Sequence, residues 1–349
     1  MSLTVALQFL FGLAISLVAG YWLVRGYWRL RSEVRRQAEG GAPLRSSRTV
    51  IWRDPGHLSV GRLEAGPCGR RGAPAPPFHF VEEHDTGSQP CVSVRDVAGQ
   101  TWRVKWGREV HTEVFGTRLA WALGYFADPA YFIRSGTILG TRDLRRARAC
   151  IDDQERFTDA RFELSERDVE RHFDAHGWAW HDNPFVGTHE LNGLKILMML
   201  VSNWDNKDVR DVARGSNTAI FEYRLADHQR EARYLIIDWG AALGAWGRNP
   251  IQRGRWDPEA FAGQNSQFVT GVDGDIVQFG YQGQRTADCS SNITRADTGW
   301  FVRVADRLTD DHLRAALLAS GANSAEIDLF TAALRARLDQ LRQAAATAP

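Results

Sequence analysis

Two aspartates stand directly after apolar segments of the chain, and their type and position suit the transfer of a phosphoryl group. Asp205 follows the apolar segment 189–202, and Asp238 follows the strand-like run 234–237. This chemistry needs one carboxylate that orients the acceptor hydroxyl and another that holds a divalent cation on the phosphates. We therefore expect Asp205 to act on the acceptor and Asp238 to ligate Mg²⁺, because hard cations prefer carboxylate oxygen.

The residues after Asp205 offer a phosphate contact and a second metal ligand. Lys207, two positions downstream, could reach the transferring phosphate. The second ligand is open between two residues: Asn217, which directly precedes the predicted strand 218–223, and Asp208, which is nearer to Asp205 in the sequence. Both side chains carry an oxygen of the kind that a hard cation binds.

Lysine is rare in this chain. Of the 43 basic residues, only Lys105, Lys195 and Lys207 are lysines. An arginine-rich coding bias would explain the imbalance, but under such a bias a lysine is favoured where a compact ammonium cannot be replaced by a planar guanidinium. Two of the three lie in segments that we expect to handle phosphates, and chance is the plain alternative.

An antiparallel meander followed by a helix is expected to position Lys105. The predicted strands are residues 78–81, 92–95 and 102–106, with turn residues between them, and residues 108–123 have helical spacing. Lys105, at the end of the third strand, would contact the α- and β-phosphates, and Glu113 of the helix would hold it in place. Glu109, one turn earlier, is the alternative partner for Lys105. If the segment has no role in nucleotide binding, Lys105 is a surface residue and both glutamates are solvated.

The turn 85–89, between the first two predicted strands, occupies the place of a phosphate-covering loop. Its Gly87 and Ser88 are the candidates for a close backbone approach to the nucleotide. One glycine is a weak signal, and the chain contains no G-x-x-x-x-G-K-[ST] motif, so a P-loop fold is not supported.

The remainder of the chain is expected to form a mainly helical part. Segment 189–202 is apolar almost all round, which is typical of a buried helix. Residues 249–299 are rich in Gly, Gln and Asn with little periodicity and are expected to form loops, whereas 308–319 and 324–344 have amphipathic helical spacing.

Residues 3–24 form a run of 22 positions without a charged side chain, which is long enough to cross a bilayer of ~30 Å. Five arginines follow between positions 25 and 36, so the positive-inside bias places the rest of the chain in the cytoplasm. We expect a single-pass anchor in the inner membrane, with a cleaved signal peptide as the competing interpretation. The expected parts are an anchor (1–25), a basic juxtamembrane segment and linker (26–77), a small lobe (78–140) and a larger lobe (141–349).

Taken together, these motifs resemble a family. Asn203-Trp204-Asp205, Asn217 at the start of a strand, and a strand ending in Asp238 before Gly240 are similar to the atypical kinases of the spore coat protein H type. More loosely, the chain resembles the secretory-pathway and toxin kinases of the same superfamily. In the toxin kinases, a helix similar to 113–120 carries the glutamate that pairs with the lysine.

The resemblance implies an α+β, bilobal protein-kinase-like fold, with ATP and Mg²⁺ or Mn²⁺ as cofactors. It implies transfer to the hydroxyl of an unknown protein or small molecule. The chain departs from ordinary kinases in having Arg210 where an asparagine follows the base, and Trp239 where D-F-G has phenylalanine.

Other interpretations of the same residues are open. A membrane-tethered pseudokinase or scaffold would share the fold without catalysis. A metal-dependent hydrolase would use a carboxylate cluster of Asp205, Asp208, Asp211 and Asp238. The net charge of +1 argues against a nucleic-acid partner, because such domains carry a concentrated basic excess.

Overall fold

The computed structural model describes residues 48–87, 89–165, 170–171, 177–206, 217–225 and 229–346, which form a mixed α+β fold. Within these ranges no helix combines the length and the apolar character that a membrane span requires. The predicted span 3–24 lies outside them, as do Ser88, Lys207 and Asp208.

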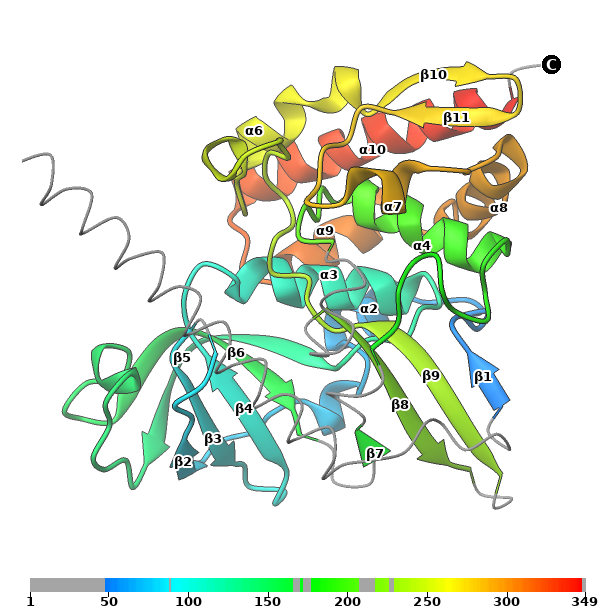
Figure 1. Cartoon of the computed structure of the whole chain (residues 1–349). Coiled ribbons are helices and arrows are strands. Elements are labelled where there is room, and N and C mark those ends of the chain that lie inside the picture. Colours follow the sequence, from blue (N-terminus) through cyan, green and yellow to red (C-terminus); the bar gives the residue numbers. More distant parts are fainter. Residues whose placement is uncertain are drawn as a thin grey trace, which may run out of the picture.

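Five strands close into a barrel at the lower left of Figure 1. They are β2 (Phe78–Glu83), β3 (Cys91–Arg95), β4 (Thr101–Lys105), β5 (Ala130–Leu139) and β6 (Arg156–Leu164), in the order β2-β3-β4-β6-β5. The expected meander is confirmed, since β2, β3 and β4 pair in antiparallel fashion. The barrel runs to Leu164, past the predicted lobe boundary at residue 140, because β6 pairs with both β4 and β5.

A second sheet lies beside the barrel (Figure 1). Its strands are β1 (Arg48–Val50), β7 (Glu170–Arg171), β8 (Thr218–Arg224) and β9 (Arg230–Ile236), in the order β1-β9-β8-β7. The antiparallel register of β8 and β9 pairs Thr218 with Ile236. This pairing brings the residue before β8, Asn217, next to the residues that follow β9.

The helices lie mostly on one side of the two sheets (Figure 1). In the described ranges they are α2 (Val60–Ala65), α3 (Val110–Ala122), α4 (His189–Leu200), α6 (Pro258–Gly263), α7 (Thr286–Ser290), α8 (Arg295–Ala305), α9 (Asp310–Ala319) and α10 (Ser324–Ala346), and a hairpin of β10 (Val269–Asp273) and β11 (Ile276–Phe279) accompanies them. Helix α3 runs between the sheets and the other helices, so it contacts both parts of the molecule.

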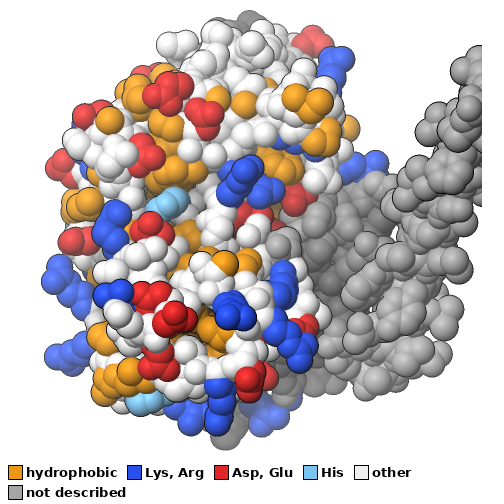
Figure 2. Space-filling model, turned by 90° about the vertical axis from the view of Figure 1, so that its left-hand side faces the viewer, with side chains coloured by type: hydrophobic (Ala, Val, Ile, Leu, Met, Phe, Trp, Pro, Cys, Tyr) orange, Lys and Arg blue, Asp and Glu red, His pale blue; other side chains and the backbone are white. Residues whose placement is uncertain are grey.

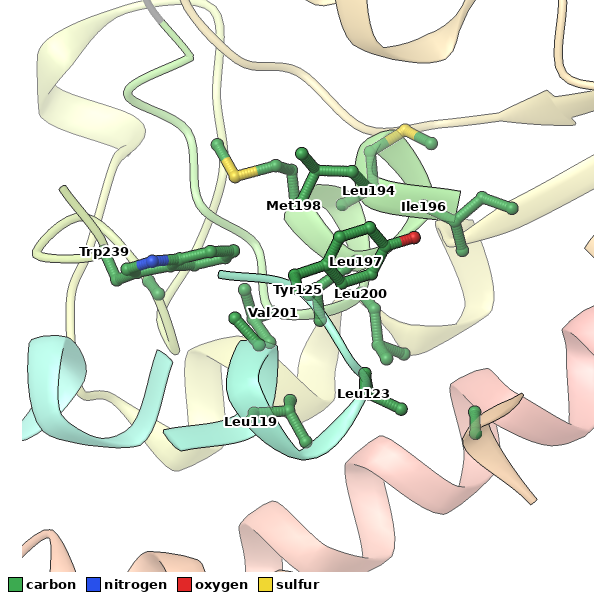
Figure 3. Packing of buried hydrophobic residues seen from close by; sticks show 14 of the residues in the cluster. Leu119, Leu123, Tyr125, Leu194, Ile196, Leu197, Met198, Leu200, Val201 and Trp239 are labelled. Carbon is green, nitrogen blue, oxygen red and sulfur yellow. The ribbon is translucent and has the colours of Figure 1, made fainter. Parts of the chain in front are cut away.

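The main hydrophobic core surrounds α4, as its all-round apolar sequence predicts. Leu194, Leu197 and Leu200 are almost fully buried. Figure 3 shows Leu119 of α3 and Trp239 among the side chains of this cluster. Thr188 begins α4 by accepting a hydrogen bond from the Leu191 N–H (3.2 Å). The core therefore fixes the C-terminal end of α4, after which Asp205 follows.

The stretch 48–77, expected to be linker, belongs to the folded body. Strand β1 pairs in parallel with β9, and Ile51 and Leu63 are buried in the main core. Arg118 of α3 donates hydrogen bonds to the carbonyls of Leu63 and Glu64 (both 2.7 Å). Buried apolar side chains and satisfied backbone groups distinguish this stretch from a solvated linker.

The surface shows no single charge sign over the face in Figure 2, where acidic, basic and hydrophobic side chains are mixed. This mixture agrees with the net charge of +1.

Candidate functional site

Helix α3 holds the segment Asp238-Trp239-Gly240 that follows β9. The Glu113 carboxylate accepts a hydrogen bond from the Trp239 N–H (2.9 Å), and the Thr112 hydroxyl donates to the Gly240 carbonyl (3.0 Å). The Gly240 N–H in turn donates to the Asp238 carboxylate (3.0 Å). These bonds fix the direction in which Asp238 leaves the sheet.

Gly116 allows Trp239 to pack against α3. A Cβ atom at this position would lie 2.5 Å from the Cβ of Trp239, which is too close without a shift of the helix or the loop. Gly116 thus leaves room for the Trp239 ring directly after the metal-ligand candidate Asp238.

Replacing Gly116 by alanine is expected to destabilise the fold by about 1–3 kcal/mol, the usual cost of overpacking a dense core. Gly61→Ala is the matched control, because Gly61 is also helical and has open space around its Cβ position. The free energy of unfolding, measured by chemical denaturation, gives both values. Equal stabilities of the two variants would show that the Trp239 contact does not constrain α3.

A polar cavity of about 230 Å³ opens between the barrel, α3 and the end of β9. Its charged lining residues are Arg103, Lys105, Glu109, Glu113, Asp128, Arg161, Glu163 and Asp238. Five carboxyl groups thus face three basic groups. An anionic ligand would meet a net negative lining unless cations came with it.

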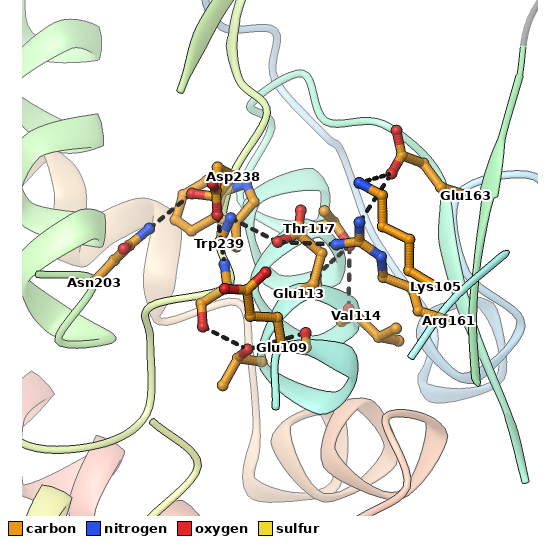
Figure 4. Close-up of polar contacts among 12 residues, drawn as sticks. Lys105, Glu109, Glu113, Val114, Thr117, Arg161, Glu163, Asn203, Asp238 and Trp239 are labelled. Carbon is orange, nitrogen blue, oxygen red and sulfur yellow. Dashed lines mark hydrogen bonds and ion pairs between the residues drawn. The ribbon is translucent and has the colours of Figure 1, made fainter. Parts of the chain in front are cut away.

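Arg161 occupies the place that the sequence assigned to Lys105. The expected clasp of Lys105 by Glu113 is corrected: Arg161 pairs with Glu113 (3.1 Å) and Glu163 (3.1 Å), and Lys105 lies 3.8 Å from Glu163 (Figure 4). Lys105 and Arg161 are directly opposite each other on β4 and β6, so their side chains share one face of the barrel. The planar fork of arginine can serve two carboxylates at once, which favours it as the partner of Glu113.

Burial governs the titration of this cluster. Loss of water raises the pKa of Glu113 to about 8, and Asp238 and Glu163 add to the rise, although Arg161 opposes it. Burial also disfavours the charged form of Arg161, but Glu113 and Glu163 outweigh burial and raise the pKa of that guanidinium. Arg161 therefore stays charged while Glu113 holds its proton near neutral pH.

The raised pKa of Glu113 makes stability depend on pH. The folded chain keeps this proton up to about pH 8, whereas an unfolded glutamic acid releases it near 4.5. The stabilisation that comes from this proton is therefore complete below pH 4.5, and it is lost as the pH rises toward 8. We expect the difference in unfolding free energy between the native chain and Glu113→Gln to change over this window, as measured by denaturation at a series of pH values. A constant difference would place the pKa of Glu113 near its ordinary value.

The predicted phosphate-covering turn lies at the cavity. Thr86 and Gly87 line it, and Gly87 has a φ of 99°, which favours glycine. Arg146 donates hydrogen bonds to the carbonyls of Thr86 (3.2 Å) and Gly87 (2.8 Å), so the turn is held from outside. Gly87 is thus well placed for contact with a ligand, and that role stays a prediction.

Asp205, Asn217 and Asp238 converge through the hydrogen bonds of two asparagines. The Asn217 side chain donates to the Asp205 carbonyl (2.6 Å), and the Asn203 side chain donates to the Asp238 carbonyl (3.0 Å; Figure 4). The Asp205 carboxylate accepts a hydrogen bond from Gln284. Asp205 is not among the residues that line the polar cavity, so it lies next to the cavity and not in its wall.

The oxygen atoms near Asp238 suit a hard divalent cation that is bound partly by the protein and partly by the phosphates of a nucleotide. The amide oxygens of Asn203 and Asn217 are buried and accept no hydrogen bond within the described part of the chain. Over the same residues, no group of three or more His, Cys, Asp or Glu side chains could hold a metal alone. One carboxylate, from Asp238, with amide and phosphate oxygens is the usual way in which Mg²⁺ is held on a nucleotide.

Comparison with solved structures gives a weak likeness to a kinase. "Crystal structure of the Golgi casein kinase with Mn/ADP bound" matches with a TM-score of 0.39 and 12% identity, over 81% of this chain and 75% of that chain. A second structure, "crystal structure of the Golgi casein kinase", matches with a TM-score of 0.32 and 11% identity, over 82% and 76% of the two chains. Both are structures of one kinase. No family model and no curated protein matches the chain. TM-scores this low carry no argument, so the interpretation of the site rests on its own geometry.

Arg337 of α10 supports the segment before Asp205 and was not predicted. Its guanidinium is fully buried and donates hydrogen bonds to the Leu200 carbonyl (2.9 Å), the Ser202 hydroxyl (2.8 Å) and the Phe261 carbonyl (2.8 Å). It also lies over the Phe261 ring, 3.7 Å from the ring centroid. Ser202 has a left-handed φ of 57°, so these bonds hold a turn that serine rarely adopts.

Proposed function

We propose that the chain is a kinase-like phosphotransferase that uses ATP with Mg²⁺ or Mn²⁺. The observation that carries the proposal is the cavity that Lys105, Glu113, Arg161 and Asp238 line together. A basic group paired with a helical glutamate, facing an aspartate at the end of a strand, is the arrangement that protein kinases use for phosphoryl transfer. Here Arg161 supplies the clasped group and Lys105 lies beside it.

Each residue has a distinct part in the proposal. Lys105 and Arg161 would neutralise phosphate oxygens, and Asp238 would hold the divalent cation, with Asn217 as the second protein ligand. The bound metal would neutralise the charge of the phosphates during transfer. Asp205 would accept the proton of the acceptor hydroxyl. Lys207 and Asp208 stay predictions outside the described residues.

The charges of the cavity support a strict metal requirement. Even with Glu113 protonated, four carboxylates face three basic groups, so the lining repels a free triphosphate. One or two divalent cations reverse this balance. We therefore propose that nucleotide binds only as its metal complex.

Nucleotide binding without transfer is the second candidate. The position of Asp205 outside the cavity lining and its hydrogen bond to Gln284 favour this alternative. The hydrolase alternative has no comparable support, because Asp208 and Asp211 lie outside the described residues. The membrane anchor at 3–24 remains a proposal from its sequence. The likeness to Golgi casein kinase does not support the finer assignment to the spore coat protein H type.

Replacing Asp205 by asparagine separates transfer from binding. We expect the release of ADP from ATP with Mn²⁺, with water or the chain's own hydroxyls as acceptor, to fall roughly 10²–10⁴-fold, the usual contribution of a general base. Binding of ADP with Mn²⁺ should change little. Asp182→Asn is the matched control, because Asp182 is exposed and away from the cavity. Binding by the native chain without any ADP release would favour the second candidate.

A further inference from the structure

A second cavity, of about 350 Å³, lies on the opposite side of the segments that form the polar cavity. Ala127 and Pro129 line it, whereas Asp128 between them lines the polar cavity. Near the end of β9, Leu235 lines the second cavity, and Ile237, which follows the strand, lines the polar one. The two cavities therefore stand back to back across the loop after α3 and adjoin each other near the end of β9.

Basic groups dominate the charges of the second cavity. Arg53, Arg62 and Arg233 line it, with Asp54 as the acidic lining residue. Buried Glu231 binds both Arg53 and Arg233 (each 2.7 Å), so one carboxylate is shared by two guanidinium groups. Asp54 is already bound by Arg307. The cavity is thus left with a net positive charge, in contrast to the polar cavity.

Aromatic rings form the walls beside these arginines. Arg233 lies over Tyr223, 3.8 Å from the ring centroid, and over Phe126 at 5.0 Å. Arg53 also lies over Phe126, at 5.7 Å. The rings hold the guanidinium planes in place, and the shared Glu231 fixes their rotation, so the binding surface is organised in advance.

Of the three arginines that line the cavity, Arg62 is the one with no carboxylate partner among the described residues. Its side chain lies over Trp121, 5.8 Å from the ring centroid, and makes none of the ion pairs found in those ranges. An arginine without an ion pair, next to a ring and at the edge of a cavity, suits the planar, bidentate recognition of a carboxylate.

We propose that this cavity, bounded by Arg53, Arg62, Trp121, Phe126 and Arg233, binds a small aromatic carboxylate. The ring would pack against the aromatic walls, and the carboxylate would accept hydrogen bonds from Arg62 and its neighbours. The volume lies within the usual range for small-molecule sites, roughly 300–1,000 Å³. This site is distinct from the proposed nucleotide site, and it stands whether or not the chain transfers phosphate.

The test is a calorimetric titration of the full chain with 2-naphthoate. We expect saturable binding, no comparable binding of neutral 2-naphthamide or of sulfate, and no competition by ADP with Mn²⁺. Arg62→Gln should weaken binding about tenfold, the effect of losing a hydrogen bond to a charged group. Arg71→Gln, an exposed arginine outside the cavity, should leave it unchanged. Phe126→Leu should weaken binding through the lost ring contact.

The proposal fails if 2-naphthoate does not bind, or if Arg62→Gln and Arg71→Gln bind it equally. Equal binding of the amide would show that charge is not recognised. Displacement by ADP with Mn²⁺ would place the probe in the polar cavity, and tight binding of AMP in place of the probe would identify a nucleotide site. Each of these results overturns the assignment without bearing on Asp238.

Discussion

Asp238→Asn is expected to weaken the Mn²⁺-dependent binding of ADP at least roughly 100-fold. Loss of a residue that merely orients a metal ligand costs about 10–100-fold, and Asp238 is proposed as the ligand itself. The substitution keeps the shape of the side chain and an oxygen that can accept the Gly240 N–H. The fold should therefore persist, and the loss of affinity for ADP should come from weaker binding of Mn²⁺.

Asp275→Asn is the matched control, because this exposed aspartate lies in the turn between β10 and β11. Its affinity for ADP with Mn²⁺ should equal that of the native chain. Calorimetry with and without EDTA measures both. If Asp238→Asn binds as tightly as the control, or if EDTA has no effect, Asp238 does not hold a metal on the nucleotide.

Arg337→Met is expected to destabilise the fold by at least roughly 3 kcal/mol, because three buried polar groups lose their partner and each such loss costs about 1–3 kcal/mol. The carbonyls of Leu200 and Phe261 and the hydroxyl of Ser202 would lose their shared donor. Methionine fills much of the volume of the arginine side chain. The lost free energy of unfolding therefore comes from the missing hydrogen bonds more than from a cavity. Chemical denaturation gives the free energy of unfolding.

Arg342→Met is the control for Arg337, since both arginines belong to α10. Arg342 pairs with Asp306 and Asp339 at the surface, where such pairs contribute within about 1 kcal/mol. A similar loss of stability in both variants would mean that the buried bonds of Arg337 contribute little. Burial lowers the pKa of Arg337, so its charge is costly and its hydrogen bonds must compensate.

The regular elements could be predicted because their periodicity is strong. The meander that ends at Lys105, the helix that carries Glu113 and the apolar helix 189–202 all appear close to their predicted bounds. Hydrophobic spacing determines which face is buried, and turn residues determine where strands end. Lys105, Glu113 and Asp238, which were predicted to act on one nucleotide, line one cavity.

The sequence could not predict which basic group pairs with Glu113. Arg161 lies in β6, a strand that was not predicted although Phe162 and Leu164 alternate with charged residues there. Its pairing depends on barrel closure, which sets β6 beside β4. The role of Arg337 could not be predicted for a similar reason, because an arginine on an amphipathic helix usually faces water. Contacts between segments far apart in the sequence decide both cases.

The most direct test is the anomalous scattering of Mn²⁺ in crystals soaked with Mn²⁺ and ADP. We expect a peak at coordination distance from the Asp238 carboxylate, with the ADP phosphates between it and the Lys105 and Arg161 side chains. A peak bound elsewhere, or ADP bound without metal in this cavity, would contradict the proposed site.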